Sequence, residues 1–153
     1  MTVAPAPSAT QLASAQEAFL PVGHDRTVVE VHDGTRWIPV VPYTDLVPGR
    51  GVALLLGGEQ IALFRDRAGH LHAVGNRDPF SGAQVMSRGL LGSRGATPVV
   101  ASPMYKQVFD LTTGACLDEP TAPDGTPARL PVWRVRTSAV ASRADNSRLM
   151  EGS

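Results

Sequence analysis

Three short apolar segments separated by tight turns lie in the centre of the chain, and they constrain its fold more than any other feature. Residues 52–56 (VALLL) and 60–65 (QIALFR) flank the pair Gly57-Gly58, which can adopt positive φ at both central positions of a hairpin turn. A second turn at residues 66–69 leads to a third segment at residues 70–74. Connections this short join antiparallel strands, because a parallel pair needs a crossover of a dozen or more residues. The pattern therefore predicts an antiparallel meander and argues against a parallel α/β fold.

The rest of the chain repeats this alternation of strand-like segments and turns. Glycine and proline occur 15 and 13 times in 153 residues, above the roughly 12% that the two residues contribute on average. We expect residues 42–49 to form a turn or a single helical turn, and residues 75–97 to be irregular. Further strands are predicted at residues 27–31, 37–41, 99–101, 108–111, 115–117 and 130–136. The prediction is an all-β fold, a small antiparallel β-sandwich or barrel.

Length, charge and cysteine content limit the organisation of the chain and its partners. A chain of 153 residues and 16.1 kDa fits one domain, which we place at residues 27–138 between flexible tails at 1–26 and 139–153. A net charge of zero argues against binding to nucleic acid or an anionic membrane through bulk charge. The single cysteine, Cys116, excludes a disulfide within the chain and a thiolate-ligated metal centre. Neither a 20-residue apolar run nor an export signal is recognisable, so we expect a cytoplasmic protein.

Two loops carry a pattern that points to one family. Residues 73–83 read AVGNRDPFSGA and residues 100–114 read VASPMYKQVFDLTTG. Each runs from a strand end through a turn with a central proline. In this frame the loops resemble the two cluster-binding loops of the Rieske iron–sulfur family, which read Cys-Pro-His and Cys-Pro-x-His-Gly, the second followed by an aromatic residue, Asp and a Thr-Gly turn. The resemblance implies a Rieske-like β-sandwich with two loops at the former cluster tip.

The four ligand positions of that family are all exchanged in this chain. Asp78 and Phe80 stand at the first Cys and His positions, and Ser102 and Tyr105 stand at the second. A Rieske centre needs two thiolates and two imidazoles. Carboxyl and hydroxyl oxygens are poor substitutes for thiolates, and a phenyl ring has no donor atom. We therefore predict no [2Fe–2S] cluster and no redox activity of this chain alone, because Cys116 lies in the hairpin beyond the second loop.

Packing and hydrogen bonds are expected to hold the two loops together instead. The rings of Phe80 and Tyr105 are predicted to pack as an aromatic staple, since each can bury about 150–250 Å². Asp78 and Ser102 are predicted to accept hydrogen bonds from backbone N–H groups of their turns.

Further motifs narrow the resemblance. They are NRDPFSGA at 76–83, SRG at 87–89, ASPMYKQVFDL at 101–111, TGACLDEP at 113–120 and LPVWRVR at 130–136. Through these motifs the chain resembles the small subunits of NAD(P)H-dependent assimilatory nitrite reductases. The resemblance covers residues 37–136. The proline-rich loop at residues 118–129 is longer than the turn of that family.

The resemblance implies an accessory role without catalytic residues or cofactors in this chain. The large subunit of that family is implied to carry FAD, an iron–sulfur centre and sirohaem, and to reduce nitrite to ammonium with NAD(P)H in nitrate assimilation. The small chain is expected to dock on that large catalytic subunit through the former cluster loops. The candidate docking residues are Arg77, Phe80, Pro103, Met104, Tyr105 and Lys106.

Two other functions of the chain stay open, a Rieske-type electron carrier and a stand-alone β domain that binds a small ligand.

Some single residues also have alternative roles. His70 and His72 lie on one face of a strand, and we prefer two solvent-facing histidines to a metal pair. For Asp78, Ser102 and Tyr105 we prefer loop hydrogen bonding to a hard cation such as Mg²⁺.

The single thiol and the exposed cations also have two interpretations each. Cys116 is expected to be a quiet core residue rather than a reactive thiol. A solvated face is preferred to an anion site for Arg77, Arg88, Arg94 and Lys106.

Overall fold

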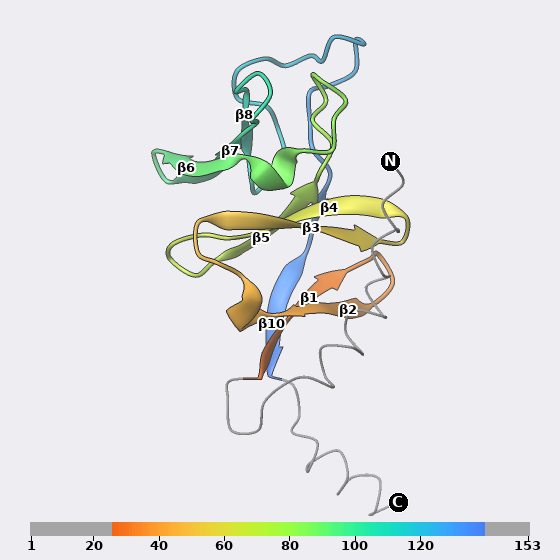
Figure 1. Cartoon of the computed structure of the whole chain (residues 1–153). Coiled ribbons are helices and arrows are strands. Elements are labelled where there is room, and N and C mark those ends of the chain that lie inside the picture. The colour runs from red at the N-terminus through yellow and green to blue at the C-terminus, as the bar shows by residue number, and fades with distance from the viewer. Residues whose placement is uncertain (1–25, 140–153) are drawn as a thin grey trace, which may run out of the picture.

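Antiparallel strands make up almost all of the regular structure (Figure 1). The computed structural model describes residues 26–139. The strands are β1 (Thr27–His32), β2 (Trp37–Pro42), β3 (Arg50–Leu56), β4 (Glu59–Arg65), β5 (Leu71–Gly75), β6 (Leu90–Arg94), β7 (Thr97–Ala101), β8 (Val108–Asp110), β9 (Val132–Trp133) and β10 (Val135–Ala139). Two single 3-10 turns, η1 (Tyr43–Asp45) and η2 (Met86–Arg88), interrupt them. The all-β prediction is confirmed, as is the helical turn expected within residues 42–49.

The expected tails fall almost wholly outside the described residues. Only Arg26 and Ala139 of the segments 1–26 and 139–153 are described, and Ala139 closes β10. Within residues 26–139, no helix is long and apolar enough to cross a membrane.

The strands form three antiparallel sheets, stacked one above another in Figure 1. The lower sheet has the order β10-β1-β2, the middle sheet β3-β4-β5-β9, and the upper sheet β6-β7-β8. The predicted meander is β3-β4-β5, and its first turn has φ values of 57° at Gly57 and 85° at Gly58. Positive φ at two successive positions is the geometry that glycine pairs permit in a two-residue hairpin.

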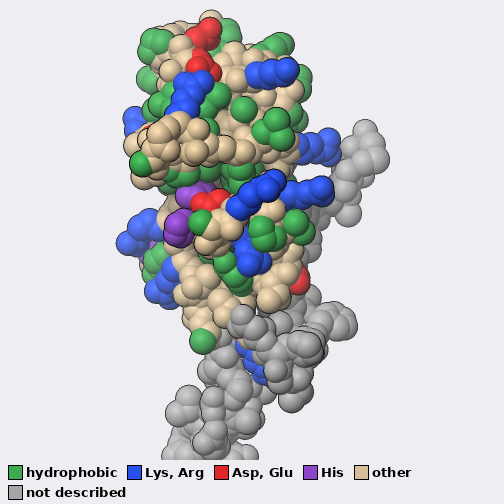
Figure 2. Space-filling view, turned by 90° about the vertical axis from the view of Figure 1, so that its left-hand side faces the viewer, with side chains coloured by type: hydrophobic (Ala, Val, Ile, Leu, Met, Phe, Trp, Pro, Cys, Tyr) green, Lys and Arg blue, Asp and Glu red, His purple; other side chains and the backbone are tan. Residues whose placement is uncertain are grey.

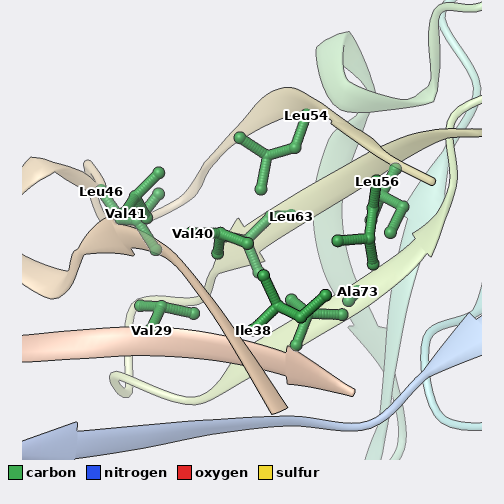
Figure 3. Packing of buried hydrophobic residues seen from close by; sticks show 11 residues of the cluster. Val29, Ile38, Val40, Val41, Leu46, Leu54, Leu56, Leu63 and Ala73 are labelled. Carbon is green, nitrogen blue, oxygen red and sulfur yellow. The ribbon is translucent and has the colours of Figure 1, made fainter. Parts of the chain in front are cut away.

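Residues of β4 alternate between two hydrophobic cores, so the middle sheet is buried on both faces. Ile61 and Leu63 point into a first core against β1 and β2, part of which Figure 3 shows. Ala62 and Phe64 point into a second core with η2, β7 and β8. Opposite pointing of successive residues is the ordinary geometry of a strand. The second core supports the two loops of the functional site.

Two details differ from the predicted strands. The segment 75–97, expected to be irregular, contains η2 and β6. Strand β6 (LLGSR) is exposed along most of its length, and its residues do not alternate between apolar and polar. It forms because it pairs with β7. Met86 of η2 is fully buried and fills the second core.

The single strand expected at 130–136 is two strands in different sheets. Strand β9 pairs with β5, and β10 pairs with β1. The break falls at Arg134, whose carbonyl accepts a 3.0 Å hydrogen bond from His32 N. A continuous strand would belong to one sheet, whereas this segment passes from the middle sheet to the lower one.

Candidate functional site

The first of the two predicted loops, residues 78–83, is a tight turn closed by its own backbone. Asp78 N donates to Ala83 O at 2.8 Å, and Gly82 N donates to Asp78 O at 2.7 Å. Gly82 has a φ of 78°. Phe80 N donates to Asp78 Oδ1 at 2.8 Å, so the side chain of the first residue caps the turn. This is the role predicted for Asp78.

The second loop, residues 102–107, repeats the same geometry. Ser102 N donates to Gln107 O at 2.9 Å, and Lys106 N donates to Ser102 O at 3.1 Å. Met104 N donates to Ser102 Oγ at 3.2 Å, as predicted for Ser102. Lys106 takes the place of Gly82 with a φ of 66°, and it is the only non-glycine residue with positive φ between residues 26 and 139.

A third turn of the same kind follows at residues 110–115. Asp110 N donates to Ala115 O at 2.9 Å, and Gly114 N donates to Asp110 O at 2.7 Å. Thr112 N donates to Asp110 Oδ1 at 2.7 Å. The Asp-x-x-x-Gly spacing of this turn is the same as in the first loop, and the sequence therefore carried a signal for the shared geometry.

A direct hydrogen bond joins the first two loops at the positions where the resemblance places two cysteines. Ser102 Oγ donates to Asp78 Oδ2 at 2.7 Å. The exposed fractions are 1% for Ser102 and 0% for Asp78. A buried polar pair of this kind strongly favours the paired state, because either group left alone would be desolvated without a partner. This side-chain bond between the loops was not predicted.

The aromatic staple predicted from Phe80 and Tyr105 is wrong. Tyr105 is 62% exposed. Phe80 instead packs beside the second core, with its ring centroid 6.2 Å from that of Phe109. The hydrogen bond between Asp78 and Ser102, rather than a pair of packed rings, joins the two loops.

The residues at the four ligand positions do not fit a [2Fe–2S] cluster. Phe80 offers no donor atom, and Tyr105 points its phenol to solvent rather than between the loops. The side-chain oxygens of Asp78 and Ser102 are bound to one another and to backbone N–H groups. Among the described residues, no group of three or more His, Cys, Asp or Glu is placed to hold a metal ion.

Five of the six candidate docking residues are exposed, and one is half-buried. Pro103, Met104, Tyr105 and Lys106 form one continuous exposed run on the second loop. Arg77 is exposed next to the first loop, with Nη2 3.5 Å from the position of a Cβ on Gly82. Phe80 is half-buried against the second core and is a support rather than a contact residue. We call the two loops with Arg77 the tip.

The proline-rich loop at 118–129 is a neighbour of the tip that sequence reasoning did not assign to it. It forms a turn in which Ala122 N donates to Thr126 O at 2.8 Å, and Ala122 is buried. The Thr126 hydroxyl and N–H hold the pKa of Asp124 below its usual value, and Arg77 adds a smaller effect. The loop therefore lies near Arg77, at the upper end of the molecule in Figure 1.

The histidine pair surrounds a carboxylate. His72 Nε2 lies 3.1 Å and His70 Nδ1 lies 3.5 Å from Asp66 Oδ2. Burial alone would raise the pKa of Asp66, but hydrogen bonds from His72 and from the backbone of His70 lower it. The side chain of His72 is 13% exposed, so the expectation that both histidines face solvent is wrong for His72.

Two further side chains have specific partners. Arg94 is not a free cation, because its Nη2 lies 2.9 Å from Asp118 Oδ1. Cys116 is partly buried beside the second core, where its sulfur accepts a 3.5 Å hydrogen bond from Glu119 N.

Comparison with known proteins agrees with this geometry. The family model of the Rieske-like [2Fe-2S] domain matches residues 36–141. The nitrite reductase (NADH) small subunit of Salmonella typhimurium is 41% identical over 86 residues, which are 56% of this chain and 80% of the relative. The Escherichia coli protein of the same name is 38% identical over the same shares.

A solved structure and a larger protein add to the comparison. The structure, assigned to the NADH-dependent nitrite reductase small subunits of Mycobacterium tuberculosis, is 45% identical with a TM-score of 0.51, over 72% of this chain and 97% of that one. A nitrite reductase [NAD(P)H] large subunit from Klebsiella oxytoca contains a similar stretch, 45% identical over 75 residues. These residues are 48% of this chain and 8% of the larger one.

Proposed function

The chain belongs to the nitrite reductase small subunits within the Rieske-like [2Fe-2S] domain family, and on this basis we propose that it is a clusterless accessory subunit that docks through its tip on the large catalytic subunit. The complex reduces nitrite to ammonium with NAD(P)H in nitrate assimilation. FAD, sirohaem and an iron–sulfur centre belong to the large subunit in this proposal. The site of action is the cytoplasm.

The observation that carries the docking role is the exposed run at the end of the second loop. Met104 and Tyr105 are 46% and 62% exposed on a turn that is closed by two backbone hydrogen bonds and capped by the Ser102 hydroxyl. Lys106 and Arg77 flank them with positive charge. Rigid, exposed aromatic and apolar side chains with cationic neighbours have the composition of interface hot spots.

The stretch within the Klebsiella large subunit supports the same role. In one polypeptide, a linker keeps a small domain near its partner at high effective concentration. A separate small subunit lacks that linker, so it needs a binding surface of its own. The tip supplies one.

The donor chemistry of the loops favours assembly over electron transfer. Asp78 and Ser102 serve as a hydrogen-bonded pair between the loops, and Phe80 serves as core packing. All three support the shape of the tip, and none is suited to replacing a thiolate or an imidazole of a [2Fe–2S] cluster. The proposal therefore assigns the redox steps to the large subunit.

Binding of purified large and small subunits tests the docking role. We expect Tyr105→Ala and Met104→Asp each to raise the Kd at least about tenfold, the scale of a hot-spot truncation. Thr35→Asp, which places a carboxylate on the exposed β1–β2 turn, is the matched control and should change the Kd less than about twofold. Wild-type protein that does not bind, or tip variants that bind as tightly as wild type, would contradict the proposal.

Turnover tests the accessory role separately. Nitrite reduction by the large subunit is measured with and without the small subunit at equal flavin and haem loading. Activity or assembly of the large subunit is expected to depend on the small subunit. If neither changes, the chain is not a functional partner of this enzyme.

A further inference from the structure

The neutral composition of the chain hides local positive charge. Every described aspartate except Asp45 accepts a hydrogen bond from a backbone N–H; these are Asp33, Asp66, Asp78, Asp110, Asp118 and Asp124. Glu30 is paired with Arg136 at 2.7 Å. The exposed arginines Arg50 and Arg67 have no ion pair with any residue between 26 and 139. These two arginines therefore have no carboxylate of the described residues within ion-pair distance.

Three arginines gather at the open end of the β3–β4 hairpin, and we call Arg50, Arg65 and Arg67 the arginine patch. Arg50 lies directly opposite Arg65 in the ladder, so both side chains leave the same face of the sheet. Arg67 lies across Gly49, with Nε 3.3 Å from the position of a Cβ on that glycine. Gly49 N in turn donates to Arg65 O at 2.7 Å.

Arg65 is held in place by its surroundings. Its guanidinium carbon lies 4.1 Å from the ring centroid of Tyr43, and its Nη1 donates to Leu46 O at 3.0 Å. The Tyr43 hydroxyl is fixed by a 2.8 Å hydrogen bond to Gly69 O. Arg65 Nε is buried without a hydrogen-bond partner among the described residues. One charge of the patch is thus pre-organised and only partly satisfied.

No carboxylate of the described residues forms an ion pair with the patch. Asp66, next to Arg65 in the chain, is engaged by His72 and by the backbone of His70, and the exposed Asp45 forms no ion pair. Figure 2 shows blue side chains gathered midway down this face, beside the purple histidines and a red acidic side chain. Like charges directly opposite in a sheet are destabilising, and an anionic partner would remove that repulsion.

The patch and the tip-bearing half lie on opposite faces of the middle sheet. Arg50 is followed by Gly51, where a Cβ would lie only 2.6 Å from Ser87 O of η2. This close approach packs η2, and with it the second core, directly beside the first residues of β3. Because successive residues of a strand point to opposite faces, Arg50 points away from η2, on the same face as Arg65 and its partners Tyr43 and Leu46.

We propose that the arginine patch binds a carboxylate-rich segment of the large subunit and forms a second contact surface, separate from the tip. The inference rests on the proposed function. Guanidinium groups bind carboxylates through two parallel N–H···O bonds, which adds direction to the charge attraction. Complementary charge also speeds encounter and makes binding dependent on ionic strength.

The test measures the Kd of the full-length small subunit for the large subunit at 50 and 300 mM NaCl. The wild-type Kd is expected to rise at least tenfold between these salt concentrations. Arg50→Glu/Arg67→Glu should raise the Kd at low salt at least tenfold and flatten the salt dependence. The control variant is Arg36→Glu, which makes the same substitution of a negative for a positive side chain on the exposed β1–β2 turn. It should change the Kd less than twofold. Arg65 is left unchanged because it holds Leu46 and Tyr43.

The outcomes separate the two proposals. If wild-type protein binds, but its Kd does not depend on salt or the patch variant binds no worse than Arg36→Glu, the patch proposal is wrong while docking through the tip stands. If the wild-type subunits do not bind at all, the proposed function fails first. Unchanged melting temperatures show that the variants are folded. If the double variant does not fold, the single variant Arg67→Glu, at an exposed position, is compared with Arg36→Glu in the same way.

Discussion

Ser102 Oγ and Asp78 Oδ2, 24 residues apart in the chain, lie 2.7 Å apart in the buried space between the two loops. The bond joins the positions where an iron–sulfur domain of this family has its two cysteines. A hydrogen bond between side chains therefore holds together two loops that a cluster holds in the family. The tip keeps its shape because each loop also closes on its own backbone.

Removing either partner of this bond should destabilise the domain. Asp78→Ala leaves the Ser102 hydroxyl and Phe80 N without an acceptor, and Ser102→Ala leaves Asp78 Oδ2 unpaired. Each is expected to lower the free energy of unfolding by about 1–3 kcal/mol. The double variant should lose less than the sum, because the two groups interact directly. Urea denaturation measures all three, and additive losses would mean that the bond contributes nothing.

Lys106 adopts a left-handed conformation that a side chain disfavours. A residue with a side chain loses about 1–2 kcal/mol of stability in that conformation. Glycine avoids this loss, but its greater backbone entropy in the unfolded state costs about 0.5–1 kcal/mol. Lys106→Gly should therefore raise the free energy of unfolding by about 0.5–1 kcal/mol, and the β-branched Lys106→Val should lower it. Equal stabilities of the two variants in urea would show that the backbone at this position is not strained.

Asp118 should make stability depend on acid. Hydrogen bonds from Val108 N and from Arg94 lower its pKa. Because the folded pKa lies below the unfolded value of about 3.9, the stabilisation is complete above that value and is lost as the pH falls through the folded pKa. The difference in melting temperature between wild type and Asp118→Asn should shrink below about pH 4. Curves that stay parallel from pH 7 to pH 3 would refute this assignment.

The donor set predicts the result of cluster reconstitution. Wild-type protein incubated anaerobically with iron and sulfide, then desalted, should stay colourless and hold no stoichiometric iron, because Phe80 and the paired Asp78 and Ser102 offer no thiolate or imidazole. A Rieske ferredoxin treated in parallel is the positive control. A reduced sample with the paramagnetic resonance signal of a [2Fe–2S] centre would disprove the prediction.

Local chemistry explains which parts of the fold were predictable. The Gly57-Gly58 turn and the alternation along β4 are short-range features, so the meander follows from the residues themselves. Strand β6 has no such alternation, since it is a mostly exposed LLGSR segment that depends on β7 for its hydrogen bonds. The segment 130–136 was assigned one strand because its residues are uniformly strand-like, while the change of sheet at Arg134 depends on residues far away in the chain.

The sequence by itself determined the all-β class, the two loops, the loss of the ligand types and the family resemblance, because each depends on residue identity and short spacing. Only the tertiary structure decided that Asp78 meets Ser102, that Tyr105 faces solvent, and that Arg50 stands opposite Arg65. Those relationships join segments between 15 and 24 residues apart or depend on the surface around them. Strand register and core packing set them, and neither is encoded by any one segment alone.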